Sequence, residues 1–397
     1  ADEEDDDAVV QAANIAILER VVLQLKAEET PDTELATRIV VRQYEERIKR
    51  LAREMAEAKP VFIAQGAGIQ RRSNGEMATR CIMALPQLLG QMGKPGTNDG
   101  RMPSLSTNFM PFMEHENPCE TAISFFTFPQ AIVDGPSMTA TNAGVRGAER
   151  VSTSIKFLFN YACNALTNQH GDINRMHEIL ADESLCEFIV GYDVYLTDSN
   201  KYADILLPDL TVQEQLHVTT NGYADPTPAV YFGQPVYEPK GERRGVYDVC
   251  CDLARRMGVY DAFSDGGKTQ EDWLRAFYEE YRGYTPGAPT WDEGFEQGLY
   301  KDEPQSVVYW EDFVNDPEGC PLATPSGKIE IYSETLAEYA DTWELEEGQV
   351  IYPIPAYDPG ARSYLDCTEE FPLLVSAFHY KAHTHSGYAM NKILEDA

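Results

Sequence analysis

The chain has 397 residues, of which 43% are hydrophobic and 24% are charged, and its formal net charge at pH 7 is −33. This length suffices for two or three domains with a sizeable core. The charge argues against nucleic acid as a partner, because phosphates would be repelled, and no apolar run is long enough to cross a bilayer. The eight cysteines are dispersed without CxxC spacing, so the sequence predicts reduced thiols and encodes no zinc or iron–sulfur site.

Two helices are predicted near the start of the chain. Residues 8–26 carry apolar side chains at helical spacing, and Pro31 interrupts the pattern. Residues 33–58 form the second predicted helix, with Asp32 as its N-cap. Both helices are compatible with a bundle or with packing on the sheet that follows.

A glycine-containing turn comes next. Residues 61–65 predict a buried strand that leads into Gly66 and Gly68, and residues 73–85 predict a helix that ends before Pro86. A strand, a glycine turn and a helix N-terminus make a phosphate-binding geometry, which is compatible with an anionic dinucleotide despite the charge of the chain. The alternative is a tight turn that needs glycine for its conformation.

Residues 155–204 organise the rest of the chain. Apolar runs at residues 155–161 and 186–192 predict strands, and residues 174–180 predict a helix between them. This is a βαβ unit with a right-handed crossover and a parallel sheet. Ligands of such sheets bind beyond the carboxyl ends of the strands, which selects the loops at residues 162–172 and 193–204.

Both loops carry groups suited to a nucleotide-like ligand. Asn164, Asn168, Gln169 and His170 in the first loop donate and accept hydrogen bonds. Asp193 lies at a strand end, where its carboxylate would accept from ribose hydroxyls or from a guanine edge.

The second half of the chain is less regular. Further strands are predicted at residues 205–208, 230–236 and 329–332, and a helix at residues 245–257. Residues 258–325 are aromatic, acidic and turn-rich, which predicts a surface excursion with its own small core. Near the end, His379, His383 and His385 follow another predicted strand; a metal site would need a fourth ligand, so we favour contact with a ligand held elsewhere.

Several of these runs resemble one known family, the molybdopterin oxidoreductases of the dimethyl sulfoxide reductase type. The similar stretches agree in order and spacing over residues 48–387, and the likeness is greatest to the catalytic A subunits of anaerobic, membrane-associated dimethyl sulfoxide reductases. The similar stretches are residues 60–96 and the runs NQHGDINRMHEIL, KYADILLP, TPSGKIEIYS and FHYKAHTHS.

The resemblance implies an α/β fold of Rossmann-like parallel-sheet domains with flanking helices. It implies a pair of molybdopterin guanine dinucleotides holding one molybdenum ion. The implied contacts to one pterin are Gln70 and Arg71, beside Gly66 and Gly68. The implied contacts to the other dinucleotide come from the two loops: Asn164, Asn168, Gln169, His170, Asp193, Thr197, Ser199, Ala203 and Asp204. His379, His385 and Ser386 resemble the late loop of the family that returns to the pterins.

The resemblance also implies how the chain is organised. We expect a partial α/β domain in residues 1–110, an irregular connection in 111–150, a Rossmann-like dinucleotide-binding domain in 151–340, and in 341–397 a connection to a truncated C-terminal domain. The family's cysteine-rich iron–sulfur segment and its molybdenum ligand have no counterpart in this sequence. We therefore expect an internal fragment that, in isolation, neither holds the complete cofactor nor turns over.

The implied partners are an iron–sulfur electron-transfer subunit, a membrane-anchor subunit and a small oxidised substrate, without nucleic acid. The full-length protein is then expected at the cytoplasmic membrane, peripheral and on the exported face, although this chain carries no signal sequence.

The sequence leaves three functional hypotheses open. The first is molybdenum-dependent reduction of an S-oxide or N-oxide, such as dimethyl sulfoxide, in anaerobic respiration, with no catalytic residue or metal ligand assigned here. The second is a non-catalytic, truncated paralogue that acts as a binding or interaction module. The third is a nicotinamide dehydrogenase using the Gly66 and Gly68 turn; Arg71 at the third glycine position and the lack of an acidic residue about twenty positions on argue against it.

Overall fold

The computed structural model describes residues 32–71, 74–101, 110–111, 117–169, 171–220, 229–303, 306–345, 349–356, 358, 367–373 and 375. The predicted helix at residues 8–26, His170 and the late loop with His379, His383, His385 and Ser386 lie outside these residues. The chain divides into two compact units. One comprises Ala1–Met102, Val308–Ile331 and Ala356–Asp358, and the other Pro103–Val307, Tyr332–Pro355 and Pro359–Ala397. The predicted domain boundaries stay predictions.

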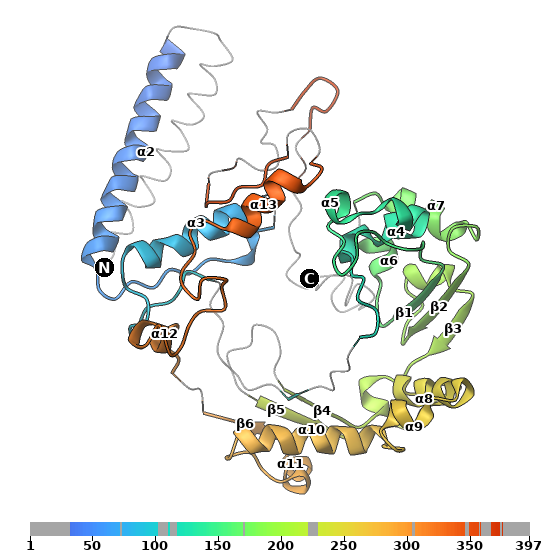
Figure 1. The fold of residues 1–397 in the computed structure, drawn as a ribbon. Coiled ribbons are helices and arrows are strands. Elements are labelled where there is room, and N and C mark those ends of the chain that lie inside the picture. Colours follow the sequence, from blue (N-terminus) through green and yellow to red (C-terminus); the bar gives the residue numbers. More distant parts are fainter. Residues whose placement is uncertain are drawn as a thin grey trace. The chain divides into compact units, whose positions relative to one another are not determined.

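The first unit is built on helices (Figure 1). Helix α2 (Asp32–Glu57) confirms the second predicted helix. Helix α3 (Gly75–Leu88) passes through Pro86, so the predicted end before that proline is wrong. Pro86 is buried, and a backbone bond from Leu89 to Leu85 closes the turn around it. Among its described residues, the other helices of this unit are η1 (Ala67–Ile69) and α12 (Glu311–Asn315).

The strand predicted at residues 61–65 is wrong. This segment forms no strand ladder within the part of the chain that the structure describes, because side-chain amides occupy its backbone groups instead. Val61 N donates to Gln91 Oε1 at 2.9 Å. Ile63 N donates to Asn98 Oδ1 at 2.9 Å, and Ile63 O accepts from Asn98 Nδ2 at 2.8 Å. The strand predicted at residues 329–332 is also wrong, as these residues form only bends and coil.

The second unit contains the predicted parallel sheet. Strands β1 (Phe157–Tyr161), β2 (Phe188–Asp193) and β3 (Ile205–Pro208) lie in the order β1-β2-β3 and pair in parallel. Helix α7 (Ile173–Ala181) connects β1 to β2, as predicted. The strands are rich in aromatic and branched residues, which suit a pleated, half-buried surface.

Helices flank this sheet (Figure 1). Helices α4 (Phe128–Asp134), α6 (Ala165–Asn168) and α7 share one core with β2, built from Ile132, Leu166, Met176 and Ile189 among others. The fold is therefore α/β with a parallel sheet and flanking helices, as expected. The connection predicted as irregular also contains η2 (Phe125–Thr127), η3 (Gly135–Ser137) and α5 (Ala140–Ala143).

A second, antiparallel sheet has the order β4-β5-β6. Its strands are β4 (His217–Thr220), β5 (Ala229–Gly233) and β6 (Leu299–Lys301). Helices α10 (Gln270–Tyr284) and α11 (Trp291–Gln297) pack against it through Tyr278, Tyr281 and Trp291. The predicted surface excursion therefore shares its core with β4 and β5. The described part of this unit also contains η4 (Ser199–Tyr202), η5 (Val212–Glu214), α8 (Val246–Met257), α9 (Tyr260–Ser264) and α13 (Glu334–Thr342).

Candidate functional site

The carboxyl ends of the three parallel strands lie side by side. The register pairs Tyr161 with Tyr192 and Asp193 with Pro208. The first strand-end loop (residues 162–172) follows β1, and the second strand-end loop (residues 193–204) begins at the end of β2. Ala162 has a positive φ of 46° and donates its backbone N–H to Tyr192 O at 2.9 Å. A non-glycine residue held in this region marks a constrained turn, a feature that concentrates at functional sites.

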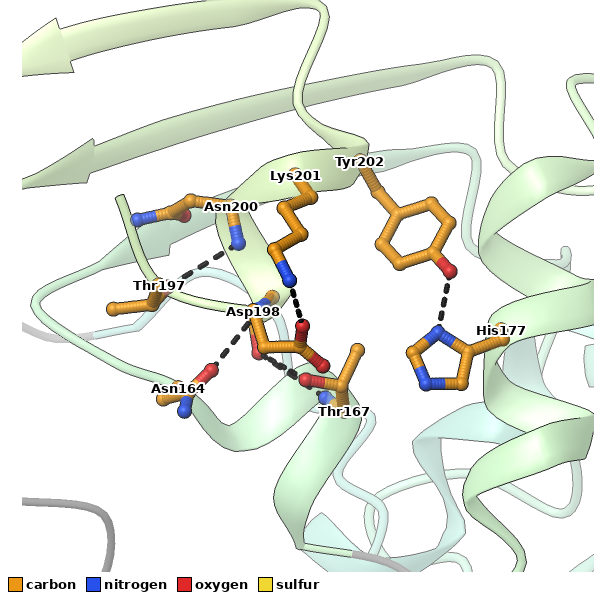
Figure 2. A network of polar contacts seen from close by, with 9 residues as sticks. Asn164, Thr167, His177, Thr197, Asp198, Asn200, Lys201 and Tyr202 are labelled. Atoms are coloured by element: carbon orange, nitrogen blue, oxygen red, sulfur yellow. Dashed lines mark hydrogen bonds and ion pairs between the residues drawn. The ribbon is translucent and has the colours of Figure 1, made fainter. Parts of the chain in front are cut away.

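A pair of buried hydroxyls joins the two strand-end loops. Ser199 Oγ accepts from Thr167 N at 3.1 Å and lies 3.1 Å from Thr167 Oγ1. Asn164 Oδ1 accepts from Ser199 N at 3.0 Å (Figure 2). Ser199 is 0% exposed and Thr167 is 1% exposed. We refer to Asn164, Thr167 and Ser199 together as the latch.

The side-chain amides of Asn160 in β1 and Asn200 in η4 form a second set of contacts to the loops. Asn160 Nδ2 donates to Cys163 O and to Asn200 Oδ1, both at 2.8 Å. Asn200 N in turn donates to Thr197 Oγ1 at 3.2 Å (Figure 2). A Cβ on Gly191 would come within 2.7 Å of Asn200 Oδ1, so this position in β2 requires glycine for the close approach.

Further polar contacts tie η4 to its surroundings. Tyr202 hydrogen-bonds through its hydroxyl to His177 Nδ1 of α7 (Figure 2). Lys201 Nζ lies 2.5 Å from Asp198 Oδ1, and this hydrogen bond lowers the pKa of the Asp198 carboxyl. Both side chains of that ion pair are substantially exposed, so it contributes little to stability.

The predicted contact residues separate into two groups. Asn168 and Gln169 are exposed, and Asp193 is half-buried with Oδ1 accepting from Tyr195 N at 3.2 Å. Asn168 and Gln169 thus lie at the surface of the first strand-end loop, and Asp193 ends β2. The side chains of the second group bond within the protein instead. Asn164 Oδ1 accepts from Ser199 N, and Thr197 Oγ1 accepts from Asn200 N.

Asp204 and Ala203 lie elsewhere. Asp204 Oδ2 accepts from Ile189 N at 2.7 Å, and Asp204 N donates to Ile189 O at 2.8 Å. Ile189 lies near the start of β2, so Asp204 is at the amino end of the sheet. Ala203 packs against the core between the sheet and its helices. The structure does not bring this pair together with Asp193.

Sequence reasoning missed an acidic and phenolic group at the same sheet edge. Asp209 follows β3 directly and is 8% exposed, and burial raises the pKa of its carboxyl. Burial and the neighbouring Asp209 raise the pKa of the Tyr161 phenol. The pKa of Tyr192 is also raised by burial, and its hydroxyl donates to Arg244 O. The signal available in the sequence was an aspartate directly after the strand ILLP.

The glycine turn of the first unit has a different character. Gly66 and Gly68 are exposed, neither has a positive φ, and a Cβ at either position would meet nothing within 4 Å. Their conformation therefore does not require glycine. Gly75 does, because a Cβ there would lie 2.4 Å from Gln70 O. Gln70 and Arg71 are exposed beside the turn.

The described residues contain no metal-binding cluster. Within them, no three His, Cys, Asp or Glu side chains are grouped so that they could hold a metal ion. Among the helices of the described residues, none has the length and apolar character needed to cross a membrane.

Comparison with known proteins identifies the family. The family model "Molybdopterin oxidoreductase" matches residues 48–256. Dimethyl sulfoxide reductase DmsA of Escherichia coli (strain K12) is 46% identical over 356 residues, which cover 89% of this chain and 44% of DmsA. The dimethyl sulfoxide/trimethylamine N-oxide reductase of Rhodobacter capsulatus is 29% identical, over 86% of this chain and 42% of its own length.

Among solved structures, acetylene hydratase from Pelobacter acetylenicus matches with a TM-score of 0.45 and 25% identity, over 68% of this chain and 31% of the hydratase. The chain thus spans less than half the length of the curated relatives it matches. The family match begins within α2 and ends within α8, so it includes the glycine turn, the parallel sheet and both strand-end loops. This protein therefore belongs to the molybdopterin oxidoreductase family.

Proposed function

We propose that this chain is the dinucleotide-binding part of a molybdenum-dependent enzyme that reduces an S-oxide or N-oxide. The relatives above are named for the reduction of dimethyl sulfoxide and of trimethylamine N-oxide. The observation that carries the proposal is the position of the Asp193 carboxylate. It stands at the carboxyl end of the central strand, directly after Tyr192, whose carbonyl accepts from Ala162 N of the first strand-end loop.

The strand ends fit the guanosine end of a molybdopterin guanine dinucleotide. A guanine edge presents N–H donors, and a carboxylate accepts two such bonds at once. Asp193 supplies that acceptor. The exposed amides of Asn168 and Gln169 would serve ribose hydroxyls and phosphate oxygens, since each amide both donates and accepts.

The glycine turn fits a second part of the cofactor. Gly66 and Gly68 leave exposed backbone without a Cβ, although the local fold would accept a side chain at either position. Close approach of a ligand to the backbone is a common reason to keep glycine where the conformation does not demand it. Arg71 adds a cation beside this backbone for a phosphate or a pterin.

When bound, the cofactor supplies the two-electron chemistry that removes an oxygen atom from the substrate. The role of this chain is to bind and orient the dinucleotides. In the complete protein we expect electrons from an iron–sulfur subunit, an anchor subunit at the cytoplasmic membrane, a position on its exported face, and a role in anaerobic respiration. The isolated chain should neither hold the complete cofactor nor turn over. Stoichiometric molybdenum in the purified 397-residue chain would contradict this.

The guanosine assignment is testable by calorimetric titration of the chain with guanosine, inosine and adenosine diphosphates. Inosine lacks the 2-amino donor and adenosine lacks both donors that a carboxylate would accept. We expect the affinity of the chain to fall from guanosine to inosine to adenosine diphosphate. Asp193→Asn should weaken the binding of guanosine diphosphate by about tenfold or more, which is the effect of losing one charge-assisted hydrogen bond.

A matched control is Glu178→Gln on the exposed side of α7, which removes the same charge away from the strand ends. Equal affinity for the three nucleotides, or equal loss in Asp193→Asn and Glu178→Gln, would contradict the assignment.

A further inference from the structure

The latch consists of contacts between segments that cannot hold their positions alone. Thr167 lies in α6, which has four residues, and Ser199 opens η4, which also has four. Helices this short have no independent stability, because nucleation costs more than their few hydrogen bonds return. Their positions therefore depend on contacts with other parts of the unit, and the latch supplies such a contact directly between them.

The hydroxyls of the latch are buried and hydrogen-bonded within the protein, so a ligand does not reach them. Ser199 and Thr167 are almost completely buried, and Ser199 Oγ already meets both the backbone N–H and the hydroxyl of Thr167. Asn164 adds the third contact through Ser199 N. A buried donor that loses such a partner pays its desolvation cost in full, so the three groups stabilise one relative position of the two loops.

The candidate ligand contacts of both loops lie within a few residues of the latch in the chain. Asn168 and Gln169 directly follow Thr167 in the chain. Asp193 and Thr197 precede Ser199 within the same short loop. A shift at the hydroxyl pair would therefore displace the candidate contact residues of one loop relative to those of the other, and small misplacements of positioned groups are costly.

We propose that the latch couples the two strand-end loops into one binding element, and that Thr167 is a positioning residue for the ligand held by Asp193, Asn168 and Gln169. Thr167 touches no ligand in this account. The positioning role rests on the proposed nucleotide site, whereas the coupling of the loops is a property of the chain itself.

The coupling is testable without a ligand by hydrogen–deuterium exchange of the full chain. Thr167→Val keeps the size and the backbone N–H of Thr167 and removes its hydroxyl, and Thr167→Ser keeps the hydroxyl. We expect Thr167→Val to raise exchange in residues 162–169 and in residues 194–203 together, and Thr167→Ser to restore both. The control is Thr219→Val, which removes an exposed hydroxyl on β4.

The positioning role is tested by titrating the same variants with guanosine diphosphate. Loss of one hydrogen bond should weaken binding by about tenfold in Thr167→Val, and Thr167→Ser should recover most of that loss. Faster exchange in only the first loop would overturn the coupling. Coupled exchange with unchanged nucleotide affinity in Thr167→Val would overturn the positioning role. If the unmodified chain does not bind the nucleotide, the proposed function and the positioning role both fail, and the exchange data still decide the coupling.

Discussion

The glycine turn of the first unit and the strand-end loops of the second unit both match the family, yet they are built in opposite ways. The turn at Gly66 and Gly68 is exposed, and a side chain at either glycine would meet open space. The strand-end loops are fixed by buried hydroxyl and amide contacts from Asn160, Thr167 and Ser199. Two segments that match the same family can therefore differ in how far buried contacts fix their conformation.

The largest effect in this comparison is expected at Gly75. A Cβ at this position would lie 2.4 Å from Gln70 O and 2.7 Å from Gln70 Cα, both backbone atoms. Gly75→Ala should therefore lower the free energy of unfolding by about 3 kcal/mol, the upper range for overpacking. Urea denaturation measures this. A neutral Gly75→Ala would show that the turn is not held by the close approach of Gln70.

The next largest effect is expected at the latch. Ser199→Ala removes the acceptor of Thr167 N and leaves that buried donor without its partner. The expected loss is about 2 kcal/mol in the free energy of unfolding, within the range for a buried unsatisfied group. The matched control is Ser184→Ala, whose hydroxyl bonds Asp182 at an exposed site. Equal losses in the free energy of unfolding for the two substitutions would mean that burial does not strengthen the contacts of the latch.

Two carboxylates near the strand ends should respond to pH with opposite sign. Burial raises the pKa of Asp209, so the folded state binds its proton more tightly than the unfolded state does. Stability then falls as pH rises from the unfolded pKa of 3.8 to the folded value. Asp209→Asn keeps an acceptor for Leu210 N, and we expect a higher melting temperature at pH 7, with the difference shrinking toward pH 3.8.

Glu214 supplies the contrasting case. The backbone N–H and hydroxyl of Thr211, together with Arg243, lower the pKa of Glu214. Its stabilisation is present above the unfolded pKa of 4.5 and is lost as pH falls through the folded value. Glu214→Gln should therefore lower the melting temperature at pH 7 and lose its effect in acid. The same sign of change in both variants at pH 7 would refute the assignment of these two shifts.

The smallest effect is expected at the exposed glycines. Gly66→Ala and Gly68→Ala should change the free energy of unfolding by no more than about 0.5 kcal/mol, and in the stabilising direction, because alanine reduces the entropy of the unfolded chain. Urea denaturation of these two variants and of Gly75→Ala compares their free energies of unfolding. A loss above about 1 kcal/mol at Gly66 or Gly68 would mean that the turn itself needs glycine.

Local sequence patterns were sufficient for the parallel sheet. The apolar runs around Phe159 and Val190 and the helical spacing of Met176 and Ile179 are short-range signals, and β1, β2, β3 and α7 follow them closely. The strand predicted at residues 61–65 failed, because a strand needs a neighbour and the apolar run carries no information about one. Pro86 misled for a different reason, because α3 continues through it to Leu88 and Leu89 N still donates to Leu85 O.

The sequence located the loops of the candidate site, but it did not predict the contacts that their side chains make within the fold. Asp193 and the loops around it could be located from the rule that ligands bind at strand ends. The sequence does not state that Ser199 is buried or that Asp204 bonds Ile189 at the amino end of the sheet. Asn160 within an apolar strand was the one visible sign of the amide network, because a buried amide needs partners.

The central claim is that the strand-end loops hold the guanosine end of the cofactor. Hydrogen–deuterium exchange of the full chain with and without guanosine diphosphate tests it most directly. We expect slower exchange in residues 162–169 and 193–203 on binding, with helix α10 unchanged as an internal reference. Protection confined to other segments, or equal protection by adenosine diphosphate, would contradict the claim.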